Sequence, residues 1–154
     1  MPETLKNGGD EVKAKEYLKQ LQMLDRLIEN KLAEKDQWKA MATSTTQQLT
    51  ADRVQTSSNP HKMADAVYKI IEIEAEIDAC IDRLVDTKRE VISTLEQLNP
   101  TEYDLLHKVY VQYMTFDDVA IKKGKSYSWV TTVHGRALKN VQDILDERKR
   151  ECVC

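Results

Sequence analysis

The sequence predicts an all-α protein in which a long antiparallel helical hairpin, a coiled coil, precedes a small helical C-terminal domain. Three observations indicate this fold class. Apolar residues recur at spacings of three and four over two long stretches, as on one face of an α-helix. Only 4 Gly and 3 Pro occur, which disfavours hairpin-rich β folds. Apolar residues make up 41% of the chain and aromatic residues 6%, a composition typical of extended, solvated helices.

The first predicted helix runs from Asp10 to about Met41. Lys, Glu and Gln separate the members of its apolar stripe. The stripe comprises Ala14, Tyr17, Leu18, Leu21, Leu24, Ile28 and Leu32. A helix of this length with one apolar stripe buries it only against another helix or a partner, so a second helix is expected beside it.

The second predicted helix begins near Pro60 and supplies that neighbour. Its stripe comprises Val67, Ile70, Ile71, Ile77, Ile81, Leu84, Val91, Leu95 and Leu98. Two such helices predict an antiparallel coiled-coil hairpin over residues 1–98. Ile70 and Ile71 stand side by side, and Ile73 and Trp38 are expected on flanking faces. The hairpin is therefore also expected to form a homodimer.

A polar segment, residues 43–60, separates the two helices. It is rich in Ser, Thr and Gln, and connections of this length are usually either functional or disordered. Two interpretations follow: a hairpin tip without a further role, or a loop that docks a partner such as RNA polymerase. The docking residues would be Asp52, Arg53, Val54 and Gln55.

The C-terminal domain, residues 99–150, opens at Asn99, a helix-capping residue that is followed by Pro. A short helix is expected over residues 101–112. Its inward residues would be Tyr103, Leu106, Val109 and Tyr110. A second helix should start at Thr115, with Asp118 completing a capping-box-like pattern and Gly124 just past its end.

The last helix should open at Ser126 or Ser128. Its inward residues would be Val130, Val133, Ala137, Leu138 and Val141. A short helix, a turn around Gly124 and a longer second helix form the helix-turn-helix plan. In that plan the second helix enters the major groove of DNA.

Charge is divided unevenly along the chain, although its net value is only −3. Residues 1–106 hold 14 Lys and Arg against 20 Asp and Glu, a net charge of −6. Residues 107–150 hold 9 against 5, a net charge of +4. The C-terminal segment is therefore a basic module on an acidic stalk, and local charge governs attraction to phosphate.

The segment "TFDDVAIKKGKSYSWVTTVHGRALKNV" resembles region 4 of bacterial sigma factors without gaps. The matching positions are Thr115, Phe116, Asp117, Asp118, Val119, Ala120, Ser126, Val130, Val133, Arg136, Ala137, Leu138 and Lys139. About nine-tenths of the chain is similar to the phage and prophage proteins related to the RinA and ArpU late transcription regulators. That similarity rests on Ser126 to Leu138, on "DRVQ" and on the long helix before Asn99. The resemblance implies a DNA-binding regulator of late phage genes.

The predicted interface with double-stranded DNA has two parts. The candidates for reading bases, from the first turns of the last helix, are Tyr127, Ser128, Trp129, Thr131 and Thr132. The candidates for contacting phosphates are Lys122, Lys123, Lys125, Arg136 and Lys139. Sigma factors place Arg and Gln where this chain has its base-reading candidates. Since Arg is the commonest partner of guanine and Thr contacts the thymine methyl, readout is expected to lean towards A·T-rich sites.

Three residues of the last helix have alternative interpretations. Trp129 is expected either to lie over the preceding turn as a partly exposed cap of the small core or to contact the groove of DNA. His134 follows a position predicted to be buried and is expected to be a polar boundary residue rather than a catalyst. Gly135 costs ~1 kcal/mol in a helix interior relative to Ala, so it is expected to permit close approach of another backbone, from protein or DNA.

An enzyme is not expected. His61, His107 and His134 lack metal-ligand spacing, and neither a phosphate loop nor a nucleophile motif occurs. No cofactor or metal is expected. The three cysteines suggest reduced thiols, and the chain lacks an apolar run of membrane-spanning length and a signal-peptide pattern, so a cytoplasmic location is expected.

Three functions remain open at this point. The first is a sequence-specific transcription regulator that works with RNA polymerase. The second is a DNA-packaging protein, because small terminase subunits also join a helix-turn-helix to a helical hairpin and assemble into rings. The third is a coiled-coil interaction module that has lost DNA binding.

Overall fold

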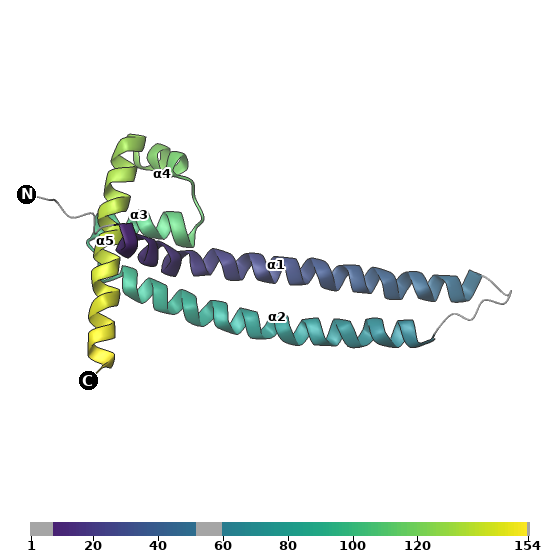
Figure 1. Cartoon of the computed structure of the whole chain (residues 1–154). Helices are drawn as coiled ribbons and strands as arrows, with labels where there is room; N and C mark the ends of the chain where they lie inside the picture. Colours follow the sequence, from purple (N-terminus) through teal and green to yellow (C-terminus); the bar gives the residue numbers. More distant parts are fainter. Residues whose placement is uncertain (1–7, 52–59, 154) are drawn as a thin grey trace, which may run out of the picture. The chain divides into compact units, whose positions relative to one another are not determined.

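The computed structural model describes residues 8–51 and 60–153, and the side chains of residues 13–44 and 61–153. All regular secondary structure in these ranges is helical (Figure 1), which confirms the all-α prediction. The helices are α1 (Gly8–Ala51), α2 (Pro60–Leu95), α3 (Pro100–Leu106), the π-helical turn η1 (His107–Val111), α4 (Phe116–Lys123) and α5 (Tyr127–Cys152). None of these helices is long and apolar enough to cross a lipid bilayer.

Helix α1 ends later than the sequence pattern suggested. It continues to Ala51, so the first part of the segment expected to form a loop is helical. Neither Pro nor Gly interrupts this segment, so nothing there terminates the helix, although its four threonines are weaker helix formers than Ala or Gln. The docking loop predicted at Asp52, Arg53, Val54 and Gln55 lies outside the described residues.

The chain divides into two compact units, residues 24–84 and residues 1–23 with 85–154. In the first unit, α1 and α2 lie side by side (Figure 1). Lys31 forms an ion pair with Glu76, and Lys35 forms one with Glu74 at 2.7 Å. Since the numbers rise on one helix as they fall on the other, the pair is antiparallel. The predicted packing of two long helices is confirmed.

The packed face of α2 in this unit differs from the predicted stripe. Ala66, Ile73 and Ile77 are buried, whereas Val67 and Ile71 are 44% and 57% exposed. The prediction that Ile73 lies on a flanking face is therefore wrong. Apart from Lys69, the side chains of α2 that are buried or half-buried in this unit are Ala66, Ile70, Ile73, Ile77, Cys80 and Leu84. Their alternating spacing of four and three is that of a coiled-coil seam, which leaves Val67, Ile71 and Ile81 on a second apolar face.

The packed face of α1 is also shifted. Leu32, which belonged to the predicted stripe, is 44% exposed, whereas the neighbouring Lys31 and Lys35 are half-buried. A lysine can lay its aliphatic stem along an apolar seam while its ammonium group reaches outwards. Glu76 and Glu74 of α2 form ion pairs with these two ammonium groups. Charged residues therefore occupy positions at the helix contact where the sequence pattern predicts apolar residues.

The second unit is built around α5. Its buried apolar residues come from all the labelled helices of Figure 1. They are Ala14, Leu18, Leu21, Val91, Leu95, Leu105, Leu106, Tyr110, Val119, Ala120, Val130, Val133, Ala137, Leu138 and Val141. Every residue predicted to face inward from the last helix is among them. Helices α3 and α4 both contact α5, which places the start of α5 beside α4.

The helix ends in this unit follow the predicted local chemistry. Asn99 caps α3, accepting a hydrogen bond from the Glu102 amide at 3.0 Å. Thr115 caps α4, accepting from the Asp118 amide at 3.2 Å. Gly124 ends α4 with a φ of 62°, the left-handed conformation that glycine adopts without strain. These boundaries are confirmed.

The segment between α3 and α4 is less regular than predicted. The expected single helix over residues 101–112 ends at Leu106 and is followed by the π-helical turn η1. Leu106 and Tyr110 are buried as predicted, but Tyr103 and Val109 are half-buried. Leu105, which was not among the predicted inward residues, is fully buried. A π-helical turn changes the angle between successive side chains, which a 3.6-residue pattern does not anticipate.

Candidate nucleic-acid interface

The turn between α4 and α5 is fixed by hydrogen bonds at both ends. The Lys125 amide donates to the Ala120 carbonyl at 3.0 Å, closing the end of α4. The Ser126 hydroxyl oxygen accepts from the Trp129 amide at 3.1 Å, which makes Ser126 the cap of α5. The first turn of α5 is therefore held rigidly beside α4.

The candidates for reading bases lie on this first part of α5. Ser128, Thr131 and Thr132 are exposed, and Tyr127 is 53% exposed. The Tyr127 ring also contacts Phe116, with ring centroids 6.0 Å apart. Trp129 is half-buried. Four of the five side chains are thus accessible to a ligand, and Trp129 is partly so.

The two threonine hydroxyls are already used within the helix. Thr131 and Thr132 each donate a hydrogen bond to the Ser128 carbonyl at 2.9 Å. With its proton directed into the helix, each hydroxyl keeps only lone pairs for an external partner. Each side chain also carries a methyl group. Such side chains accept from base amino groups or contact the thymine methyl, and they do not donate to guanine.

Three of the predicted phosphate contacts remain available. Lys122, Lys125 and Lys139 are exposed. Among the described residues, none of the three forms an ion pair with an acidic side chain. The Lys125 ammonium nitrogen lies 5.6 Å from the centroid of the Trp129 ring, an attractive cation–π distance. Lys125 therefore lies against the first turn of α5.

Lys123 is engaged elsewhere. Its ammonium group pairs with Asp104 of α3, and Lys108 pairs with the same carboxylate. Burial raises the pKa of Asp104, but hydrogen bonds from Lys108 and Lys123 lower it more, so that its pKa lies below the ordinary value. Lys123 therefore ties α4 to α3, and its role as a phosphate contact is less favoured than the sequence suggested.

Arg136 has a partner that sequence reasoning missed. Its Nε donates to Glu102 of α3 at 3.1 Å, and Asn140 donates to the other oxygen of Glu102 at 2.9 Å. Glu102 is 1% exposed. A Glu three residues after a capping Asn usually turns back towards the cap, so its contact with a distant helix carried no signal in the sequence.

His134 is buried rather than at a boundary, which corrects the prediction. It is 7% exposed, its Nε2 lies 2.8 Å from the Tyr110 hydroxyl, and its ring lies 4.7 Å from that of Phe116. Burial lowers the pKa of His134 from 6.5 to about 4, with a smaller contribution from the charge of Lys15. A neutral imidazole therefore packs in the core between η1, α4 and α5.

Gly135 lies on α5 between Thr132 and Lys139. Apart from its chain neighbours and the adjacent backbone of α5, a Cβ at Gly135 would meet no described atom within 4 Å. The fold of the described chain therefore gives no packing reason for a glycine there. Gly in a helix interior costs about 1 kcal/mol relative to Ala.

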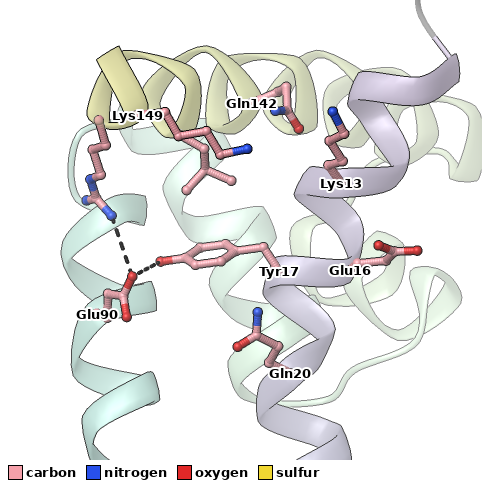
Figure 2. Close-up of a pocket in the computed structure, with 9 residues that line it drawn as sticks. Lys13, Glu16, Tyr17, Gln20, Glu90, Gln142 and Lys149 are labelled. Atoms are coloured by element: carbon pink, nitrogen blue, oxygen red, sulfur yellow. Dashed lines mark hydrogen bonds and ion pairs between the residues drawn. The ribbon is translucent and has the colours of Figure 1, made fainter. Parts of the chain in front are cut away.

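A groove of about 390 Å³ lies elsewhere in the same unit, among α1, α2 and α5. Figure 2 shows Tyr17 reaching from α1 to Glu90 of α2. The Tyr17 hydroxyl also lies 3.1 Å from Thr94, and burial raises the pKa of Tyr17 above its ordinary value. Arg148 of α5 lies 4.0 Å from the same Glu90 carboxylate. This network joins three helices, and none of the predicted DNA-contacting residues lines the groove.

The described side chains contain no group of three or more His, Cys, Asp and Glu that could hold a metal ion. Cys80 and Cys152 are free thiols. Comparisons with known protein families, curated proteins and solved structures found no match to this chain. A function must therefore be inferred from the residues and geometry of the chain itself.

Proposed function

We propose that this protein is a sequence-specific DNA-binding transcription regulator of the phage late-gene type. The observation that carries the proposal is the surface at the start of α5. There, Ser128, Thr131 and Thr132 are exposed, and so are Lys125 and Lys139, neither of which forms an ion pair among the described residues. Helices α4 and α5 act as a helix-turn-helix unit, with α5 as the recognition helix.

The chemistry of α5 favours two kinds of DNA contact. Lysine ammonium groups neutralise phosphates irrespective of sequence and set the register of the protein on the duplex. Thr131 and Thr132 offer methyl groups and acceptor lone pairs, which suit thymine methyls and the amino groups of adenine and cytosine. The target site is therefore expected to be rich in A·T pairs where the first turns of α5 contact it.

Gly135 gives independent support. It lies close to Thr132 and Lys139, and no described atom would touch an added side chain there. A residue that lowers helix stability without a packing role fits a surface that something outside the chain approaches closely. In the proposed complex that partner is the DNA.

Regulation of late genes, in contact with RNA polymerase, is proposed from the similarity to the RinA and ArpU regulators. A homodimer through the hairpin is proposed as well. The exposed Val67, Ile71 and Ile81 of α2, rather than Ile73, would supply its contact face. A ring-shaped oligomer in light scattering would favour a DNA-packaging protein instead, and absence of salt-dependent duplex binding would favour an interaction module.

The proposal is tested by selecting bound duplexes from a random pool and then measuring variants on the selected site. Lys139→Ala should weaken binding to all duplexes alike and reduce the salt slope by about 1, because one phosphate contact is lost. Thr132→Ala should cost ~1–3 kcal/mol on the selected site and little on random DNA. Glu147→Gln serves as a control on an exposed position of the same helix. If no sequence motif is enriched, α5 does not read bases.

A further inference from the structure

The side chain of Glu102 is buried, but the cation that it binds is not. The Glu102 side chain is 2% exposed, whereas that of Arg136 is 59% exposed. A purely structural ion pair in a core would shield both charges from water. Here the acid is hidden behind α5 and the guanidinium group is displayed on its surface.

The cost of burying this carboxylate is offset by a full set of partners. One oxygen accepts from Arg136 Nε at 3.1 Å, and the other accepts from Asn140 Nδ2 at 2.9 Å. The Glu102 backbone is fixed as well, because its amide donates to the Asn99 side chain. A buried acid with these contacts has little freedom to move, and it is costly to leave unpaired.

The geometry of the guanidinium group decides where its remaining donors point. The group is planar, and its Nε is occupied by Glu102. Its two terminal nitrogens have no hydrogen-bond partner among the described residues. Arg136 follows Thr132 by four residues, which is about one helical turn, so the two residues lie on the same side of α5.

We propose that Glu102 is a positioning residue for DNA binding, which holds Arg136 so that its terminal nitrogens grip one phosphate group of the duplex. The inference rests on the function proposed above. A planar guanidinium with two free nitrogens matches two phosphate oxygens. Anchoring Nε in advance reduces the side-chain entropy that Arg136 loses on binding.

The direction in which Glu102→Gln changes DNA affinity distinguishes a positioning role from a general effect of net charge. Glu102→Gln removes one negative charge from a basic module, so net charge alone predicts stronger DNA binding. Positioning predicts weaker binding, because a neutral partner holds the guanidinium group less firmly. Glu147→Gln removes the same charge from an exposed site of α5 and provides the matched control.

The experiment measures affinity for a fixed duplex and its salt dependence in the full chain, with a circular-dichroism check of folding. Arg136→Ala should weaken binding at least about tenfold, because hydrogen bonds to a charged phosphate group are lost, and reduce the salt slope by about 1. Glu102→Gln should weaken binding in the wild-type background. In the Arg136→Ala background, Glu102→Gln should change affinity by less than about twofold. Independent substitutions would add their effects, whereas Glu102 is proposed to act only through Arg136.

Arg136→Lys keeps the charge and leaves Glu102 intact, so it provides the test if the Glu102 variant does not fold. It should bind nearly as weakly as Arg136→Ala, because lysine cannot pair with Glu102 and grip two phosphate oxygens together. Equal weakening by Glu102→Gln in both backgrounds, or full binding by Arg136→Lys, would overturn the positioning role. If Lys139→Ala also leaves binding unchanged, the proposed function itself fails.

Discussion

The two units of the chain are stabilised by different kinds of packing. In residues 24–84 only Leu24, Ala66, Ile73 and Ile77 are buried apolar residues among those described, whereas the other unit has fifteen. Two helices cover each other on one side only, so most apolar side chains of the pair keep contact with water. Several helices around α5 can enclose a side chain completely. The region proposed to bind DNA is thus the firmly packed one, whereas the helical pair leaves apolar side chains exposed.

The largest expected change in stability comes from truncating a large side chain in the core around α5. Leu138 is 0% exposed, so Leu138→Ala should lower the free energy of unfolding by ~2–5 kcal/mol. Urea unfolding followed by circular dichroism measures this. The matched variant Ile77→Ala, in the helical pair, should lower the free energy of unfolding by less, because water and flexible side chains can fill the space left by the removed side chain. Equal losses would remove the proposed difference between the units.

Lowering the pH should reduce the free energy of unfolding of the same unit, because His134 is buried in its neutral form. Its pKa is lowered from 6.5 to about 4 on folding, so the unfolded chain binds the proton more tightly. The free energy of unfolding therefore keeps its full value above pH 6.5 as far as His134 is concerned. It decreases as the pH falls towards 4, because unfolding then allows His134 to bind a proton. At 1.36 kcal/mol per pKa unit the loss amounts to ~3 kcal/mol at most.

Unfolding measured at several pH values checks this expectation. A His134→Gln variant should lose the pH-dependent part between pH 6.5 and 4 while keeping the dependence due to other groups. An unchanged slope in that variant would mean that His134 titrates normally in the folded protein.

A smaller effect is expected at Gly135, where stability and DNA binding should change in opposite directions. Gly135→Ala should raise the free energy of unfolding by ~1 kcal/mol, because Ala favours the helix and its Cβ meets open space. Binding to the selected duplex should fall, because the methyl group would stand on the surface that is proposed to contact DNA.

Thermal unfolding and duplex titration of the same preparation provide both measurements. Gly124→Ala is the contrasting variant, because its φ of 62° makes any side chain there destabilising. Unimpaired binding by Gly135→Ala would remove this glycine from the proposed interface.

The smallest effect is expected for the ion pairs on the helical pair. Lys31→Ala removes the partner of Glu76, which raises the pKa of Lys31 through a hydrogen bond. Ion pairs near the surface contribute little to stability and are screened by salt. The unfolding midpoint should therefore shift less than in the other variants, and the shift should shrink at high salt. A shift as large as that of Ile77→Ala would mean that charge pairs, not the apolar seam, hold these helices together.

Local features of the fold were predictable because each depends on a few neighbouring residues. The capping roles of Asn99, Thr115 and Ser126 and the turn at Gly124 involve hydrogen bonds within about one helical turn, and the structure confirms them. The helical pair was predictable as well, because long apolar stripes need a partner. The exposed positions of Tyr127, Ser128, Thr131 and Thr132 followed from the same periodicity.

The sequence by itself therefore determined the all-helical fold class, where the C-terminal helices begin and which side of α5 is polar. Only tertiary structure decided that Ile73 rather than Ile71 is buried, that Lys123 pairs with Asp104, and that Glu102 holds Arg136 across 34 residues. Each of these contacts depends on the rotation of one helix about its axis relative to another. A rotation of one residue position moves a side chain by about 100°. Sequence periodicity fixes that angle too loosely, and the packing of the assembled helices sets it.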